Sequence, residues 1–492
     1  MRRTRWRLAL PVLGTVAALC STSPDAMAAT HSTPLAAGGG SSTSSLAPRT
    51  LLTSRHPPVI RQATGQSSVI ETVSNLVANP MASSGVGSWT AASDAGPIKV
   101  TSVALPAGAP AAHAIQIARP AATGSWAFAL AELQQPSGFV VGQTYQMQVW
   151  VRDLNASGQA AGILLANGNY SHRPTDASVF GSYRDTAWHR LTRTFLCTGT
   201  ASPDTALYVS LPSKGSLGWQ LTAATVAPVK AASPTKVGPT ATRSVTFNGA
   251  AGSAPDAQMW NREVGGNGWG NNELQTYTGS TSNSSVDGSG NLALTARREQ
   301  ATGPDGIQRQ YTSARLTTQG KLEIQPGSYV EATIKAPVGK GVWPAFWLIG
   351  TNQATVGWPA CGELDVLEGQ GATPTVAYSA LHASATADPS KDASFGWGDA
   401  GGAYDLGTPL DSGFHTYGVY FDGSTVRFYI DRTERMSLWA TDATDNGRTW
   451  PFSKPQFLVL NVAVDHTVDA TTSFPRTMTV KSIAQWQGGI PF

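Results

Sequence analysis

The chain has 492 residues, of which 13% are charged, and its net charge is +3 with 51 glycines. This length allows two or three domains that each bury a core, and the glycine content favours short strands joined by many turns. The low, balanced charge excludes a polyanion-binding protein, and no Lys/Arg-rich stripe points to nucleic acid.

The first 28 residues are predicted to be a secretory signal peptide. Four arginines lie within residues 2–7, residues 8–19 are apolar, and Ala26-Met27-Ala28 has the small-x-small pattern of a cleavage site. Twin-arginine export and a lipid anchor at Cys20 fit the flanking residues less well. No later segment approaches the roughly 20 apolar residues of a membrane span. We therefore expect a secreted, extracellular protein that does not associate with membranes after cleavage.

A β-sandwich is predicted over residues 75–228, after a disordered segment at 29–74 that is rich in Ser, Thr, Gly and Pro. Residues 143–152 alternate apolar and polar side chains, which indicates a strand with one buried face. Similar short strands are expected around 188–197 and 206–211, so this region should be entirely β.

Three motifs in this region, at 75–80 with Trp89, at 142–145 and at 188–193, resemble carbohydrate-binding modules of the jelly-roll, galactose-binding-like type. The resemblance implies glycan binding by aromatic rings that stack on sugars. A structural spacer is the alternative. For each candidate ring taken singly, a core position is favoured over a sugar platform. The candidates are Trp89, Trp150, Tyr170, Trp188 and Trp219.

Residues 229–243 contain Pro and Thr in the manner of a linker, and the β pattern resumes after them. Residues 414–421 and 425–430 flank Asp422-Gly423, a strong hairpin signal. We found no helical periodicity of twelve residues or more. The chain is thus predicted to be all-β, with two β-sandwich (jelly-roll) domains joined by a linker and the second domain at 244–488.

Signal cleavage would leave two cysteines, Cys197 and Cys361, in different predicted domains. A disulfide between them is not expected, so large cores should stabilise the chain. Cys361 has the same strand parity as Glu363, but no base is placed to ionise it. A packing role is favoured over a nucleophilic one.

The most informative segment is 358–370, because it places Glu363, Asp365 and Glu368 within six positions. In a regular strand Glu368 would point to the face opposite the other two acids and be buried as a charge. One extra residue at a β-bulge between Asp365 and Glu368 would bring all three acids to one face. With Trp358 nearby, this arrangement predicts a carbohydrate-cleaving site. A metal-binding or N-cap cluster is the alternative, which the aromatic flanks disfavour.

This segment, together with residues 268–278, 341–350 and 414–417, resembles the laminarinase-type branch of glycoside hydrolase family 16. The resemblance spans roughly 244–488 and implies that Glu363 is a nucleophile and Glu368 an acid/base. Asp365, between them, would hold the orientation of Glu363. Retaining hydrolysis needs two carboxyl groups about 5–5.5 Å apart, one ionised and one protonated. Two long Glu side chains that lean together from Cα atoms about 13 Å apart can meet this requirement.

The same resemblance implies a set of residues on the substrate side of the acids. Trp347 and Trp358 are the favoured sugar-stacking residues, and Glu273 is as compatible with a structural hydrogen-bonding role as with substrate contact. The predicted substrate-binding residues are Trp269, Asn271, Trp343, Trp347, Trp358 and His382.

Two departures from the family pattern affect these expectations. Lys481 stands where relatives commonly carry an Asp that helps to hold a structural calcium ion. Calcium is therefore disfavoured, no cofactor should be required, and no catalytic metal is expected. The loop at 465–469 also lacks the family's Gly-Gly-x-Trp pattern, which leaves the linkage preference open.

The sequence thus predicts a secreted, monomeric, retaining endo-β-glucanase that cleaves β-1,3-glucan or mixed β-1,3/1,4-glucan by double displacement. Its partner would be the polysaccharide substrate. The alternatives are another family 16 specificity, such as galactan hydrolysis or transglycosylation, and a non-catalytic glucan-binding protein. The last is disfavoured because such relatives typically lose one of the acids, and all three are present.

Overall fold

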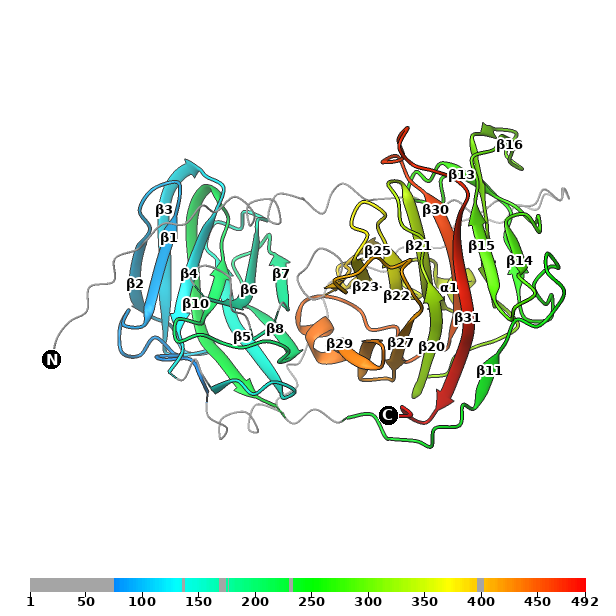
Figure 1. Ribbon diagram of the computed structural model, residues 1–492. Coiled ribbons are helices and arrows are strands. Elements are labelled where there is room, and N and C mark those ends of the chain that lie inside the picture. The colour runs from blue at the N-terminus through cyan, green and yellow to red at the C-terminus, as the bar shows by residue number, and fades with distance from the viewer. Residues whose placement is uncertain (1–74, 135–137, 168–173, 176, 230–232, 396–401) are drawn as a thin grey trace, which may run out of the picture.

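The computed structural model describes residues 75–134, 138–167, 174–175, 177–229, 233–395 and 402–492, which form two β-sandwiches (Figure 1). The predicted signal peptide and the segment 29–74 lie outside the described residues. Within them the helices are α1 (Gln353–Val356) and α2 (Ala440–Asp445), and neither has the length of a transmembrane span. The all-β prediction is confirmed.

The N-terminal sandwich consists of two antiparallel sheets. Strand β5 (Thr144–Asp153) buries every second residue, as its alternation predicts. One sheet has the order β1 (Trp89–Ser93), β4 (Ala127–Glu132), β9 (Ala206–Ser210), β6 (Ala160–Ala166), β7 (Ser178–Ser182). The other has the order β2 (Lys99–Ala104), β3 (His113–Thr123), β10 (Lys214–Pro228), β5, β8 (His189–Leu196).

The aromatic residues proposed as sugar platforms in this sandwich divide into two groups. Trp89 and Trp219 are buried in the core, so they do not form a platform. Trp150 and Trp188 are partly exposed, and each has an arginine guanidinium about 6 Å from its ring centre. Tyr170 lies outside the described residues.

The second sandwich packs an outer sheet against the sheet that holds the acids. The outer sheet has the order β14 (Ser284–Val286), β15 (Leu292–Ala296), β31 (Arg476–Gln487), β20 (Ser328–Lys335), β27 (His415–Phe421), β28 (Thr425–Ile430), β29 (Thr433–Trp439), and β11 (Arg243–Val245) pairs with β31. The acid-bearing sheet has the order β12 (Asn261–Arg262), β19 (Arg315–Thr317), β30 (Gln456–Val464), β21 (Val342–Gly350), β22 (Glu363–Gly369), β23 (Val376–His382), β26 (Ala403–Asp405). The hairpin predicted around Asp422-Gly423 is the β27–β28 pair.

Three short strand pairs lie outside these sheets. They are β13 (Gln275–Tyr277) with β18 (Tyr311–Ser313), β16 (Ala301–Thr302) with β17 (Gln308–Arg309), and β24 (Ser384–Ala385) with β25 (Asp388–Asp392). The β24–β25 hairpin directly follows β23, one of the strands beside the acids.

The described part of the predicted linker is hydrogen-bonded to the C-terminal end of the chain. The amide of Ile490 donates to the carbonyl of Thr235 at 2.9 Å, and the indole of Trp486 donates to the carbonyl of Pro239 at 3.0 Å. This stretch is therefore fixed to the second sandwich rather than free between the two.

Candidate active site

A β-bulge in β22 brings the three acids to one face of the sheet. Against β21, Asp365 pairs with Trp347 whereas Leu367 pairs with Phe346, so Val366 is the extra residue. The register against β23 shifts at the same place, between Asp365 and Glu368. Leu364, Val366 and Leu367 are buried towards the outer sheet. The bulge predicted from the spacing of the acids is confirmed, and its cause is the avoidance of a buried charge.

The strand registers place three rows of side chains on this acid-bearing face. Because successive rows are two residues apart on every strand outside the bulge, all of them point the same way. The first row is Arg315, Asn461, Ala345, Glu368 and Tyr378; the second is Thr317, Val459, Trp347, Asp365 and Ala380; the third is Phe457, Ile349, Glu363 and His382.

The two glutamates lie in an environment that keeps protons on carboxyl groups. Burial raises the pKa of Glu363 and Glu368, and the nearby charge of Asp365 adds to the effect at both. The cations of His382 and Arg315 oppose the rise at Glu363. At Glu368 the indole N–H of Trp343 donates to Oε1 at 2.9 Å. One carboxylate and one carboxylic acid on the same face can therefore coexist near neutral pH, as coupled groups.

His382 bridges two carboxylates beside the acids. Its Nε2 lies 3.2 Å from Oδ2 of Asp365, and its Nδ1 lies 2.8 Å from Oδ2 of Asp392. Burial alone lowers the pKa of His382, but hydrogen bonds to these two carboxylates outweigh it and hold the pKa well above its usual range. The imidazole is therefore cationic, which balances the negative charge of Asp365.

Arg315 fills the space between two of the predicted substrate-binding tryptophans. Its guanidinium carbon lies 4.6 Å from the ring centre of Trp269 and 4.7 Å from that of Trp347, and Glu263 forms an ion pair with it. Trp347 also donates its indole N–H to Asn461 at 2.7 Å. These contacts fix both rings, so each can offer sugar only the side that Arg315 leaves free.

Trp358 and Trp347 pack over a small apolar cluster that includes the fully buried Cys361. Burial raises the pKa of the Cys361 thiol to about 12, so this cysteine has a packing role. The ring of Trp358 lies 5.8 Å from that of His382 and is partly exposed beside the acids.

Asn271 and Glu273 occupy different environments although they are close in sequence. Asn271 is exposed and hydrogen-bonds to the buried carboxyl of Glu273. Glu273 also accepts from Tyr277 at 2.9 Å, and Asn461 donates to the Tyr277 hydroxyl at 3.2 Å. Burial raises the pKa of Glu273 despite these partners. Glu273 is thus a structural residue at the end of a hydrogen-bonded chain that leads to Trp347.

The geometry by itself is compatible with two kinds of chemistry. Among the described residues, one group of three acidic or imidazole side chains brings its ligand-type atoms within 4.8 Å of one another: Glu363, Asp365 and His382. Such a group is able to bind a cation or to serve as a catalytic carboxylate cluster.

Comparison with known proteins decides between them. The sequence profile of the glycosyl hydrolases family 16 matches residues 271–481, which contain all three acids. A beta-glucanase of Rhodothermus marinus is 34% identical over 219 residues, which cover 43% of this chain and 71% of that protein. The chain belongs to glycosyl hydrolases family 16. It is a glycoside hydrolase.

Two further relatives match a similar share of this family 16 enzyme. A glucan endo-1,3-beta-glucosidase of Cryptopygus antarcticus is 34% identical over 221 residues, covering 42% of this chain and 75% of that protein. The laminarinase catalytic domain of Thermotoga maritima is 34% identical, with a TM-score of 0.45 over 50% of this chain and 98% of that domain.

Three residues of the family 16 site were not found from the sequence: Arg315, Asn461 and Asp392. Each lies far along the chain from the acids or on a short hairpin, and each reaches the site only through the order of the strands. Asn461 is in register with Glu368 across two strand pairings and Arg315 across three, so only the strand order would have indicated them. No pattern in the sequence marks Asp392.

The position expected to help hold calcium in family 16 has a cation instead. Lys481 lies on β31 with its ammonium 5.9 Å from the ring centre of Phe414. Calcium takes oxygen ligands, mainly carboxylates and carbonyls, so this side chain does not fit the ion.

Removal of divalent cations is therefore expected to leave the protein unchanged. The melting temperature and the rate of glucan hydrolysis, measured before and after dialysis against EDTA, should agree. A melting temperature that falls with EDTA and recovers with added calcium, but not with magnesium, would contradict this expectation.

Proposed function

We propose that the protein is a secreted, retaining, endo-acting β-glucanase whose principal substrate is β-1,3-glucan. The observation behind the proposal is that the bulge aligns Glu363, Asp365 and Glu368 on one face flanked by tryptophans. Its support from the comparisons is 34% identity to two glucanases over 219 and 221 residues. Mixed β-1,3/1,4-glucan is the next substrate in order. Export would depend on residues 1–28.

In the first step, ionised Glu363 attacks the anomeric carbon while Glu368 donates its proton to the departing glycosidic oxygen. The bond between that carbon and oxygen breaks, and a covalent glycosyl–Glu363 ester forms. In the second step Glu368, now a carboxylate, removes a proton from water as the water oxygen attacks the same carbon. Glu363 leaves as a carboxylate, so both groups return to their starting states and the β configuration is retained.

Asp365 and His382 lie beside Glu363 and allow it to change from a carboxylate to a neutral ester and back. Asp365 is buried between the two glutamates along the strand, and cationic His382 lies against it. Their opposite charges largely cancel, so Asp365 holds its place without keeping Glu363 permanently protonated. Trp343 has a related role at Glu368, because its N–H stabilises the carboxylate that forms when the proton is given up.

The partly exposed rings on this face would bind pyranose units on either side of the acids. Trp358 lies towards the Glu363 and His382 end. Trp347 lies towards Arg315. Stacking on rings at these two positions favours a polymer that crosses the strands, which fits internal rather than terminal cleavage.

The test is a comparison of product lengths from laminarin, lichenan and agarose at equal concentration. We expect short oligosaccharides of several lengths from laminarin early in the reaction, slower release from lichenan, and none from agarose. Proton NMR of the first products should show the β anomer before mutarotation. Release from agarose alone, or a first product with the α configuration, would contradict the proposal.

A further inference from the structure

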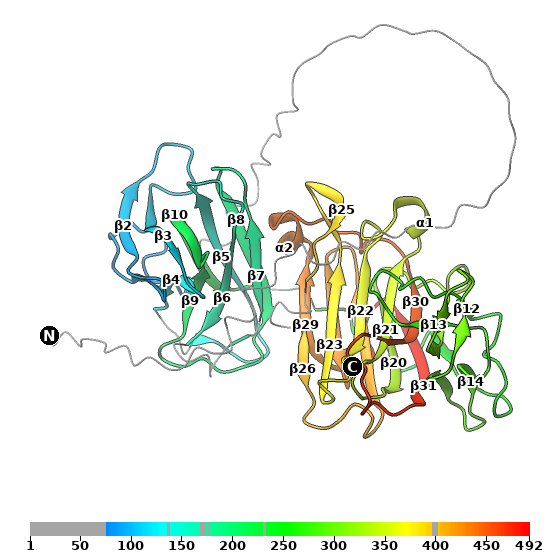
Figure 2. The same ribbon diagram turned by 90° about the horizontal axis from the view of Figure 1, so that it is seen from above.

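The N-terminal sandwich contacts the second sandwich through the edge of β8. The backbone N–H of Thr194 donates to Oδ2 of Asp442 at 2.6 Å, and its hydroxyl donates to Oδ1 at 2.9 Å. Asn446, which follows α2, donates to the carbonyl of Thr192 at 2.7 Å. Asp442 is fully buried, so both of its oxygens depend on these partners. Figure 2 shows α2 against β8.

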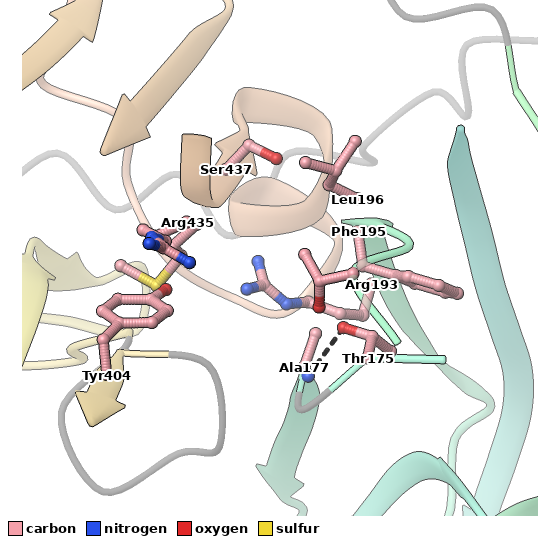
Figure 3. A pocket seen from close by; sticks show the side chains of 10 residues that line it. Thr175, Ala177, Arg193, Phe195, Leu196, Tyr404, Arg435 and Ser437 are labelled. Atoms are coloured by element: carbon pink, nitrogen blue, oxygen red, sulfur yellow. Dashed lines mark hydrogen bonds between the residues drawn. The ribbon is translucent and has the colours of Figure 1, made fainter. Parts of the chain in front are cut away.

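An ion pair and a small pocket lie beside this contact. Arg190 of β8 forms an ion pair with Asp445 of α2. A small pocket beside the contact is lined by residues of both sandwiches, with Arg193 from β8 facing Tyr404 and Arg435 from the second domain (Figure 3). The contact therefore joins an edge strand of one sandwich to the edge strands β26 and β29 of the other, and it covers backbone groups that β8 would otherwise leave open.

The residues that follow α2 also hold the β24–β25 hairpin. The amide of Thr386 donates to the carbonyl of Gly447 at 2.7 Å, and the amide of Thr449 donates to the carbonyl of Ser384 at 2.8 Å. The guanidinium of Arg448 donates to the carbonyl of Ala393 at 3.1 Å. These bonds attach both ends of the hairpin to the segment that the N-terminal sandwich contacts.

Asp392, the last residue of β25, connects this hairpin to the active site. Its carboxylate accepts a hydrogen bond from Nδ1 of His382, so Nε2 is directed at Asp365. The direction of Nε2, and with it the contact between His382 and Asp365, thus depends on where the hairpin holds the Asp392 carboxylate. A continuous series of contacts runs from β8 through α2 and the hairpin to His382.

We propose that the N-terminal sandwich, docked on α2, positions Asp392 and through it His382, so that it contributes to turnover even on soluble substrates. This inference rests on the proposed glucanase function. A double-mutant cycle measures the coupling between the docked sandwich and Asp392. Asp392 is a positioning residue in this scheme, because it acts through His382.

The local step is tested with Asp392→Ala and Asp392→Asn in the full chain, on short soluble β-1,3-oligosaccharides. The alanine variant should lower kcat about tenfold with KM little changed. The asparagine variant, which keeps an oxygen acceptor for Nδ1, should recover part of the loss. Equal kcat in all three proteins would overturn the positioning role.

The long-range step is tested with the double variant Arg190→Glu/Thr194→Val, which replaces the ion pair with repulsion and removes one hydrogen bond to Asp442. We expect kcat to fall several-fold and amide hydrogen exchange over residues 384–393 to become faster. The matched control is Arg152→Glu, since Arg152 contacts Thr186 and Trp188 within its own sandwich. The control should change neither quantity.

The cycle is closed by combining the double variant with Asp392→Ala. If docking acts through Asp392, the double variant should lower kcat little further when residue 392 is already alanine. An undiminished further loss, or unchanged exchange over residues 384–393 in the double variant, would overturn the inference. A wild-type protein that cleaves no glucan would instead remove the proposed function, and the exchange measurement alone would then decide whether docking holds the hairpin.

Discussion

Replacement of Glu363 by alanine is expected to lower hydrolysis of laminarin by at least about 10⁴-fold, because the proposed covalent intermediate forms on this carboxylate. Added azide should then restore turnover of a β-glycoside with an activated leaving group. It would occupy the space of the lost carboxylate and attack the anomeric carbon directly. The product should be an α-glycosyl azide, which NMR identifies.

The control for this experiment is Glu323→Gln, a change at an exposed carboxylate outside the three rows of the acid-bearing face. It should leave the rate unchanged. Glu363→Gln should retain binding to insoluble β-glucan in a pull-down assay while losing turnover. If Glu363→Ala hydrolysed laminarin at the wild-type rate, or if azide gave the β product, the nucleophile would have to be another residue.

Replacement of Glu368 by alanine should have an effect that depends on the leaving group. With laminarin the loss is expected to be about 10²- to 10⁴-fold, the usual contribution of a general acid. With an aryl glycoside whose phenolate departs without a proton, formation of the intermediate should be nearly normal and its hydrolysis slow. Azide should accelerate that second step and give a β-glycosyl azide, the opposite anomer to that from Glu363→Ala.

The pH dependence supplies a second readout for the same variant. Glu368 must be protonated to act as the acid, and its raised pKa keeps the proton to higher pH than an ordinary glutamic acid would. Wild-type activity should therefore fall as pH rises through that pKa, and the alkaline limb should disappear in Glu368→Ala with the activated substrate. A persistent alkaline limb would show that another group titrates there.

The contact between the two sandwiches gives the N-terminal domain a role that does not depend on binding a ligand. Two of the aromatic residues expected to bind sugar, Trp89 and Trp219, are buried in its core, whereas its edge strand β8 makes hydrogen bonds to α2 and the residue after it. A domain that fixes a hairpin next to the acids has a function in the enzyme whether or not it also binds glycan. Glycan binding by this domain stays a prediction.

The sequence by itself determined the all-β class and the common face of the three acids. Both follow from the two-residue period of a strand, since a carboxylate on the wrong side would be buried without a partner. Residues 358–370 therefore indicated the bulge without any knowledge of the neighbouring strands.

Only the tertiary structure decided which groups surround those acids. Arg315 and Asn461 reach the face because β19 and β30 lie beside β21 in the sheet, an order that local sequence does not encode. Asp392 reaches His382 through a short exposed hairpin that is held by a segment after α2. Periodicity along one strand gives the direction of a side chain, but its partners depend on long-range pairing, which is why these contacts could not be predicted.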